Sequence, residues 1–436
     1  MSPLRGVLRA WGAGMEAATW LALVPGRILA RRGGLPLATD LAERLGRSAP
    51  VAPPGRAPWL VHAVSAGEMA AASALVAEMA RRDVGLRALL STGTSAGRAV
   101  AESTRRRFPD VVTGVTYLPW DRPRAVERWL ARAGVEAVAV VEAEIWPGLF
   151  EGARRAGIPL VLCSGRMTPG EARRYVLVRP FLGPAFEVPG WIGVQSPEDV
   201  ARFVGAGAPP DRVFLSGNLK WDAPPGGRPL PAAWEAVLGG DVVVAASTHA
   251  PEEEVLLEAL RLVRSSVPGA RLVLAPRRVS RAGSIAALAR RDGHTTALLS
   301  DAPPAGWDVL VVDAFGYLPE LYRRAGAAFV GGSLSRRGGH SPAEPALAGV
   351  PLLMGPSDEN SRGEARRLET SGALFRVGGN DPARSAASAL VALLSDPVAQ
   401  ARAREALGSA AAGLRGAAKA AVNALLGIVG PPAPPV

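Results

Sequence analysis

Two Ser-x-x-Glu patterns could carry chemistry in this 436-residue chain, one in each half. The first lies in HAVSAGE at residues 62–68 and the second in GGHSPAE at residues 338–344. Each follows a β-like run and precedes an apolar stretch with helical spacing. This joint between a strand and a helix is where α/β proteins bind ligands and react with them, so both Glu residues are candidate site residues.

The same spacing also describes a purely structural device. Ser at the N-cap with Glu three residues later forms a reciprocal capping box at a helix start. Pro342 would occupy the favoured first helical position of the second copy, so capping alone explains Ser341 and Glu344. In the first copy, helix capping does not account for His62 and Gly67. We expect His62 to be a strand histidine whose hydrogen bonds are satisfied, and Gly67 would let a ligand approach the backbone.

Thirteen β-like runs, separated by helix-like or polar stretches, must position these residues. Alternation of this kind predicts an α/β fold in which a parallel sheet has helices on both faces. The alternation stops at WDAPPGGRPLPAAW, residues 221–234, where Pro and Gly indicate an interdomain linker. The predicted strands are WLVHAV, LRALLST, VVTGVTY, EAVAVVE, IPLVLC, WIGVQS and RVFLSG before the linker, and DVVVAAS, RLVLAP, TTALLS, DVLVVD, AAFVGG and VPLLM after it.

Composition sets the broad class. A 48% hydrophobic content in 436 residues supports two sizeable cores. The single cysteine, Cys163, excludes an internal disulfide framework and sits in an apolar run, which predicts a buried thiol. The net charge of +11 favours anionic partners, but an aromatic content of 5% and spread arginines argue against nucleic acid.

Several kinds of site are not supported by the sequence. No Walker-type glycine loop and no G-x-G-x-x-G after a strand is present, and four histidines with one cysteine give no metal-ligand spacing. We therefore expect neither a metal nor a cofactor.

The first 33 residues form an apolar segment with arginines at both ends. Glu16 and Pro25 interrupt it, so a membrane span is not indicated, and no small-residue cleavage site marks a secretory signal. Its tryptophans and flanking arginines suit a segment lying in a lipid headgroup layer, although an ordinary surface helix has the same pattern.

Six motifs occur in order over residues 60–360: HAVSAGE, VVEAEIWPGLF, SGNLKWD, ASTHAPEEE, APRR and FVGGSLSRRGGHSPAEPALAGVPLLMGP. Such an ordered set is more specific than any single motif. With it, the chain resembles the Kdo transferases, bacterial enzymes that move 3-deoxy-D-manno-oct-2-ulosonic acid (Kdo) from CMP-Kdo to the lipid A precursor.

The resemblance implies a GT-B fold: two doubly wound, Rossmann-like domains facing a central cleft. It implies an inverting, metal-independent and cofactor-free glycosyltransferase of lipopolysaccharide biosynthesis, at the cytoplasmic face of the inner membrane. The expected parts are a membrane-associating segment 1–47, an acceptor domain 48–222, a linker 223–235, a CMP-sugar domain 236–410, and a C-terminal helix with a disordered tail, 411–436.

The resemblance also assigns roles. Glu68 is the general base toward the acceptor hydroxyl, with Ser65 and Gly67 beside it, and Glu142 and Lys220 stabilise the transition state. A structural salt bridge is the alternative for that pair. The remaining substrate-binding residues are Glu144 near the acceptor and, around the nucleotide, Ser247, Thr248, His249, Pro276, Arg277, Gly316, Tyr317, Leu318, Ser341, Pro342, Ala343 and Glu344.

Three residues depart from the family pattern: Ser341 stands where Asn is usual, Arg278 where His is usual and Tyr317 where Glu is usual. All three fall in the donor pocket. A carboxylate bonded to a backbone N–H loses basicity. We therefore expect that Glu68 leaves its capping box incomplete, whereas Ser341 and Glu344 can both cap a helix and line the pocket.

Two other functions stay open from the sequence. One is another GT-B nucleotide-sugar enzyme, a UDP-sugar transferase or an epimerase. The other is a non-enzymatic basic module that binds anionic lipid, in which both Glu residues only cap helices.

Overall fold

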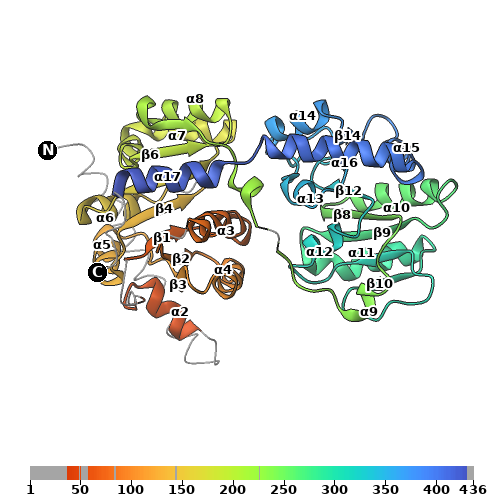
Figure 1. The fold of residues 1–436 in the computed structure, drawn as a ribbon, viewed down its shortest axis with the longest axis horizontal. Coiled ribbons are helices and arrows are strands. Elements are labelled where there is room, and N and C mark those ends of the chain that lie inside the picture. Colours follow the sequence, from red (N-terminus) through yellow and green to blue (C-terminus); the bar gives the residue numbers. More distant parts are fainter. Residues whose placement is uncertain are drawn as a thin grey trace. The chain divides into compact units, whose positions relative to one another are not determined.

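The computed structural model describes residues 37–48, 50, 57–82, 85–142, 145–224 and 226–429. These residues form two compact units. One contains the residues up to Pro224 together with those from Arg415 onward, and the other contains residues 226–414. Each unit is a parallel seven-stranded sheet with helices on its faces (Figure 1), as the alternation of runs predicts.

The first unit has the strand order β3-β2-β1-β4-β5-β6-β7, and all its pairings are parallel. Its strands are β1 Trp59–His62, β2 Ala88–Thr92, β3 Val112–Tyr117, β4 Ala137–Val141, β5 Leu160–Gly165, β6 Trp191–Val194 and β7 Val213–Leu215. Its helices are α2 Leu37–Arg44, α3 Ala66–Arg81, α4 Ser95–Arg107, α5 Pro123–Ala133, α6 Pro147–Ala156, α7 Pro169–Leu182, α8 Pro197–Ala206 and α17 Ala417–Val429, with 3-10 turns η1 Gly183–Glu187, η2 Pro210–Arg212 and η3 Leu219–Asp222.

The central strands of this sheet are buried on both faces, which explains their continuous apolar sequences. Trp59 and Val61 of β1 join a core built with α3 and α17, whereas Leu60 joins a second core with α5 and α6. Cys163 is fully buried in the first of these cores, as its apolar run predicts.

The second unit has the order β10-β11-β9-β8-β12-β13-β14, again parallel. Its strands are β8 Val242–Thr248, β9 Arg271–Pro276, β10 Thr296–Leu298, β11 Val309–Val311, β12 Ala327–Val330, β13 Leu352–Met354 and β14 Leu374–Arg376. Its helices are α9 Ala232–Glu235, α10 Glu252–Val263, α11 Ala282–Arg291, α12 Leu318–Tyr322, α13 Ala343–Leu347, α14 Arg362–Thr370, α15 Pro382–Ser395 and α16 Pro397–Ala412, with η4 Val279–Arg281.

All thirteen predicted strands are confirmed, and β14 was not predicted because its three residues carry only two apolar side chains. The C-terminal helix α17 returns to the first unit and packs on α3. Both carboxylate oxygens of Asp222 accept its first N–H groups, those of Gly416 (2.9 Å) and Ala418 (2.8 Å). Nothing in the sequence predicted this return.

Residues 397–429 form the one stretch in the described part of the chain that is long and apolar enough to cross a membrane, by length and composition alone. The stretch is two helices, α16 and α17. Leu407 of α16 and Leu425 of α17 are buried, each within its own unit.

Candidate functional site

The two sheets share a feature that locates their ligand sites. In each, the strand order reverses beside the first strand: between β1 and β4 in the first unit, and between β8 and β12 in the second. Ligands bind outside the carboxyl ends of the strands at such a switch point. Glu68 follows β1 and Glu142 follows β4, so the two predicted catalytic carboxylates lie at the switch point of the first unit.

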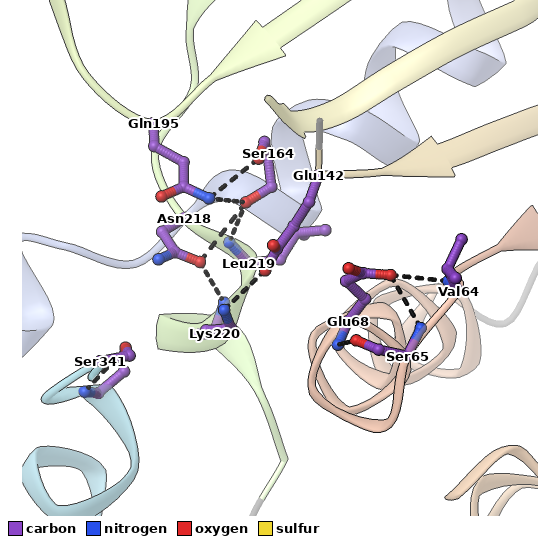
Figure 2. A network of polar contacts seen from close by, with 11 residues as sticks. Val64, Ser65, Glu68, Glu142, Ser164, Gln195, Asn218, Leu219, Lys220 and Ser341 are labelled. Carbon is purple, nitrogen blue, oxygen red and sulfur yellow. Dashed lines mark hydrogen bonds and ion pairs between the residues drawn. The ribbon is translucent and has the colours of Figure 1, made fainter. Parts of the chain in front are cut away.

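Glu68 completes its capping box, so the expectation of an incomplete box was wrong. Its Oε2 accepts the N–H groups of Val64 (2.7 Å) and Ser65 (2.9 Å), and the Ser65 hydroxyl accepts the Glu68 N–H at 3.4 Å. Two N–H groups at the strand-to-helix turn need an acceptor, and the N3 carboxylate is the nearest. Oε1 makes no hydrogen bond to the described residues, so one oxygen is fixed and the other is free for a ligand (Figure 2).

Gly67 is exposed, and a Cβ built there would meet only the Ser65 hydroxyl, at 4.0 Å. The space above this helix start is therefore open. The open space fits the expected approach of a ligand to the backbone beside Glu68.

Glu142 and Lys220 form an ion pair with an Nζ to Oε1 distance of 2.6 Å. Glu142 has φ 65, a left-handed backbone that is costly for a non-glycine residue and is typical of functional sites. Its N–H donates to the Cys163 carbonyl at 2.8 Å, which holds this turn against β5. Glu144, the other predicted carboxylate of this loop, lies outside the described residues.

A buried polar cluster that the sequence did not predict supports Lys220. The Ser164 hydroxyl, at the end of β5, accepts the Leu219 N–H at 3.2 Å, and Asn218 Oδ1 accepts the Lys220 N–H at 3.0 Å. Gln195 at the end of β6 donates to the Ser164 carbonyl (3.0 Å) and hydroxyl (3.2 Å) (Figure 2). Asn218 stands inside SGNLKWD, but Ser164 and Gln195 are single polar residues after apolar strands, which gives no recognisable spacing.

His62 is only half satisfied, so its prediction was partly wrong. Its Nδ1 lies 2.9 Å from the Ser91 hydroxyl, but Nε2 is buried and has no partner among the described residues. Trp146 meets the ring edge-on, with a centroid distance of 6.0 Å. Burial lowers the pKa of His62 to about 4, so the ring is neutral near pH 7.

In the second unit, Ser247, Thr248 and His249 end β8 at the switch point. Ser247 has φ 56, and a Cβ at Gly331 after β12 would lie 2.4 Å from the Ser247 carbonyl oxygen. The two strand ends therefore touch. His249 Nε2 lies 3.0 Å from His340 Nε2, which joins the loops after β8 and β12.

The start of α10 carries two buried carboxylates. Glu252, fully buried, accepts the N–H groups of His249 (2.9 Å), Gly332 (2.8 Å) and Leu334 (2.9 Å). Glu253, also buried, binds the Thr248 hydroxyl at 2.8 Å and pairs with Arg281 at 2.8 Å. These carboxylates hold the loops after β8 and β12 together.

The predicted donor residues on neighbouring loops lie at the same sheet edge. Pro276 ends β9, and the Arg277 N–H donates to the Thr248 carbonyl at 3.1 Å while its side chain is exposed. Gly316 (φ 96) and Tyr317 lead into Leu318, the first residue of α12. The Arg228 guanidinium lies over the Tyr317 ring, 4.7 Å from its centroid, so a cation stands against this predicted donor residue.

The second Ser-x-x-Glu does not form a capping box, contrary to expectation. Helix α13 begins at Ala343 with Pro342 as its N-cap, and the Ser341 hydroxyl accepts only the Ala343 N–H, at 3.3 Å (Figure 2). The reciprocal bond from Glu344 is absent, because Pro342 has a helical backbone and shifts the helix start by one residue. Glu344 has an exposed surface, but the surrounding protein desolvates its carboxyl and raises the pKa of that group to about 7.

Comparison with known proteins decides the family. Residues 39–223 match the family model described as 3-Deoxy-D-manno-octulosonic-acid transferase (kdotransferase). The 3-deoxy-D-manno-octulosonic acid transferase of Bordetella pertussis is 33% identical over 409 residues, covering 91% of this chain and 93% of the relative. This chain belongs to the Kdo transferase family.

A second Kdo transferase, from Haemophilus influenzae, is 29% identical over 378 residues and covers 85% of this chain and 86% of that relative. The expectation that the chain is a glycosyltransferase is confirmed by this membership. Solved structures show the fold: the UDP-GlcNAc 2-epimerase of Neisseria meningitidis matches with a TM-score of 0.55 at 14% identity, covering 85% of this chain and 100% of the epimerase. The GT-B prediction of two Rossmann-like domains is confirmed, and at this identity the likeness shows the fold alone.

Proposed function

We propose that this Kdo transferase family member moves Kdo from CMP-Kdo to the lipid A precursor by a single inverting displacement, with Glu68 as general base. The observation that carries the proposal is that the two oxygens of the Glu68 carboxylate differ in their hydrogen bonding. Oε2 is held by two backbone N–H groups, which fixes the plane of the group, and Oε1 is left for the acceptor hydroxyl. A base must be within hydrogen-bond reach of its proton in a fixed orientation, and the capping box supplies the orientation.

The Glu142–Lys220 pair supplies charge beside this base. As the bond between the sugar carbon and the CMP phosphate breaks, positive charge develops on the sugar and negative charge on the departing phosphate. The acceptor oxygen forms the new bond and its proton passes to Glu68. A fixed carboxylate and ammonium that are partly shielded from water can stabilise these opposite charges without reorganising.

In the second unit, the donor would bind along the loops after β8, β9, β11 and β12. Arg277 is exposed at that edge and unpaired by any carboxylate in the described part of the chain, so it is our choice for the phosphate. Glu344, exposed and not used in capping, suits the ribose hydroxyls. CMP should protect the chain against thermal unfolding, and UMP should not, because the pocket would read the cytosine edge.

The decisive experiment compares Glu68→Gln with wild type, using CMP-Kdo and lipid A precursor. The amide oxygen of Gln can still accept both N–H groups, so folding should be kept while proton transfer is lost, lowering kcat by about 10²-fold or more. Unchanged kcat in Glu68→Gln would rule out Glu68 as the base.

The chain offers a matched control for this test. Thr168 and Glu171 form the same complete capping box at the start of α7, with Glu171 Oε2 accepting the Thr168 N–H at 2.7 Å. Glu68→Ala and Glu171→Ala should each lower the free energy of unfolding by about 1 kcal/mol. Only Glu68→Ala should abolish transfer.

We also propose that the protein works at the cytoplasmic face of the inner membrane, since its acceptor would be a lipid. The basic, apolar segment 1–33 supports this proposal by its composition and lies outside the described residues. Unchanged vesicle binding after deletion of residues 1–33 would remove that segment from the proposal.

A further inference from the structure

Arg228 differs from the other arginines around helix α12 because no carboxylate of the described residues pairs with it. Arg323 pairs with Glu320, and Arg324 pairs with Glu320 and, at 2.6 Å, with Glu235. Arg228 is exposed and belongs to the second unit, like the others. An exposed guanidinium without a counter-ion can bind the oxygens of an anionic ligand.

The side chain of Arg228 is held in one place. Its guanidinium lies over the Tyr317 ring, 4.7 Å from the centroid, and its Cγ lies 3.3 Å from the position of a Cβ built at Gly316. Tyr317 is buried, with 8% of its surface exposed, so the ring is itself fixed. A ring face attracts the cation without using its N–H donors. A donor group that is ordered beforehand loses little conformational entropy when a ligand binds.

The backbone around Arg228 is also fastened to the second unit. The Arg228 N–H donates to the Gly316 carbonyl at 2.8 Å. The Gly226 carbonyl accepts a hydrogen bond from the Arg323 guanidinium at 3.2 Å, and Leu230 is buried. This part of the predicted linker therefore lies along the loop that follows β11.

The place of that loop connects Arg228 to the predicted donor site. Gly316 and Tyr317 follow β11, whereas Arg277 follows β9, and these two strands pair in parallel. The loops after adjacent parallel strands lie at the same edge of a sheet, where ligands bind. This edge therefore has a second exposed cation besides Arg277.

We propose that Arg228, held by the Tyr317 ring, binds an anionic oxygen of the nucleotide-sugar donor. In CMP-Kdo, the phosphate and the carboxylate of the sugar acid are attached to the same sugar carbon. Two such anions side by side suit two arginines on neighbouring loops, because a guanidinium fork matches either group. The inference rests on the proposed function, which names this donor.

The first test removes the guanidinium and keeps the rest. In the full chain, Arg228→Met retains an apolar stem over Gly316 and the backbone N–H bond, so folding should be kept. We expect the Kd of CMP, measured by calorimetry, to rise by about tenfold, because one charge-assisted hydrogen bond is lost. Cytidine, which lacks the phosphate, should bind both chains equally. A rise confined to the KM of CMP-Kdo would assign Arg228 to the carboxylate instead of the phosphate.

The matched control is Arg291→Met. Arg291 is another exposed arginine of the second unit, at the end of α11 and shortly before β10 begins, so it lies at the opposite edge of the sheet. This variant should bind CMP as wild type does. A lower melting temperature of Arg228→Met, with the Kd of CMP and the KM of CMP-Kdo both unchanged, would overturn the proposal and leave Arg228 as a structural clamp.

The second test concerns the ring beneath the guanidinium. Tyr317→Leu keeps an apolar side chain but removes the ring face, so Arg228 is no longer held in position. The loss of CMP affinity caused by Arg228→Met should then be smaller in the Tyr317→Leu background than in wild type. Equal losses in the two backgrounds would overturn the role that the proposal gives to the ring.

The proposed function and the role of Arg228 fail in different ways. A wild-type chain that binds neither CMP nor CMP-Kdo would refute the proposed donor, and the role of Arg228 with it. A wild type that binds CMP and transfers Kdo, beside an Arg228→Met variant with the same Kd and KM, would refute the role of Arg228 alone.

Discussion

The ammonium of Lys220 lies 2.6 Å from the carboxylate of Glu142, and Glu142 adopts a left-handed backbone at the end of β4. The strained residue is thus held in an ion pair with a residue 78 positions later in the chain. The Glu142 side chain is 13% exposed and that of Lys220 31%, so the pair is partly shielded from water.

This pair gives the first prediction. Glu142→Gln and Lys220→Met should each lower kcat by about 10²–10³-fold, because each removes one preorganised charge. The double variant should lose far less than the product of the two losses, since the charges act as a unit. Steady-state kinetics with thermal melts would decide: a loss of stability with kcat intact would make the pair a structural salt bridge.

The second prediction concerns Ser164 and distinguishes the contribution of its hydroxyl to stability from the cost of its left-handed backbone. Its φ of 59 suits glycine and strains alanine. Ser164→Gly should therefore be more stable than Ser164→Ala by about 1 kcal/mol, although both lose the acceptor for the Leu219 N–H. Denaturant unfolding measures this difference.

The same two variants should also affect catalysis. Both should lower kcat to a similar extent, because the turn that carries Lys220 is loosened in each. Equal stability of the two variants would show that the left-handed backbone carries no cost here.

His62 predicts a pH dependence of stability. Burial lowers its folded pKa to about 4, whereas an unfolded histidine titrates near about 6.5. The unfolded chain therefore binds the extra proton first as pH falls, and stability is lost between about pH 6.5 and 4, by about 3 kcal/mol in total. His62→Gln, which can keep the bond to Ser91, should flatten the curve of unfolding free energy in that window. An unchanged slope would mean that other groups govern it.

Gly331 tests the switch point of the second unit. A Cβ there would meet the Ser247 carbonyl oxygen at 2.4 Å, so Gly331→Ala must push apart the ends of β8 and β12. We expect the thermal protection by CMP to disappear in this variant. Gly283→Ala on α11 is the control, because nothing lies within 4 Å of its added methyl and the helix should gain about 0.5–1 kcal/mol. Full CMP protection in Gly331→Ala would show that the donor binds away from this contact.

The sequence predicted the fold because apolar runs with turn residues between them carry the signal for buried parallel strands. Glu68, Glu142 and Lys220 lie at one sheet edge for the same reason, since each belongs to the segment that follows a strand. Their roles stay predictions. The sequence could not predict Ser164 or Gln195, because a single polar residue after a strand looks the same whether it faces water or braces a turn.

The capping boxes show where local pattern fails. The two Ser-x-x-Glu copies have identical spacing, but only the first forms a capping box. In the second, Pro342 has a helical backbone and displaces the start of the helix. At Glu68 the completed box still leaves one oxygen open, a detail invisible in sequence: the two oxygens of one carboxylate have different partners.

The return of α17 to the first unit sets an order of events during synthesis. Domains generally fold as units as they leave the ribosome, N-terminal first. Here the first unit must wait for the last stretch of the chain, because Ala421, Val422 and Leu425 complete its core and Asp222 caps the returning helix. A nascent chain stopped before residue 415 would contain all seven strands of both sheets but would lack the helix that covers the α3 side of the first core, leaving that side open to chaperones.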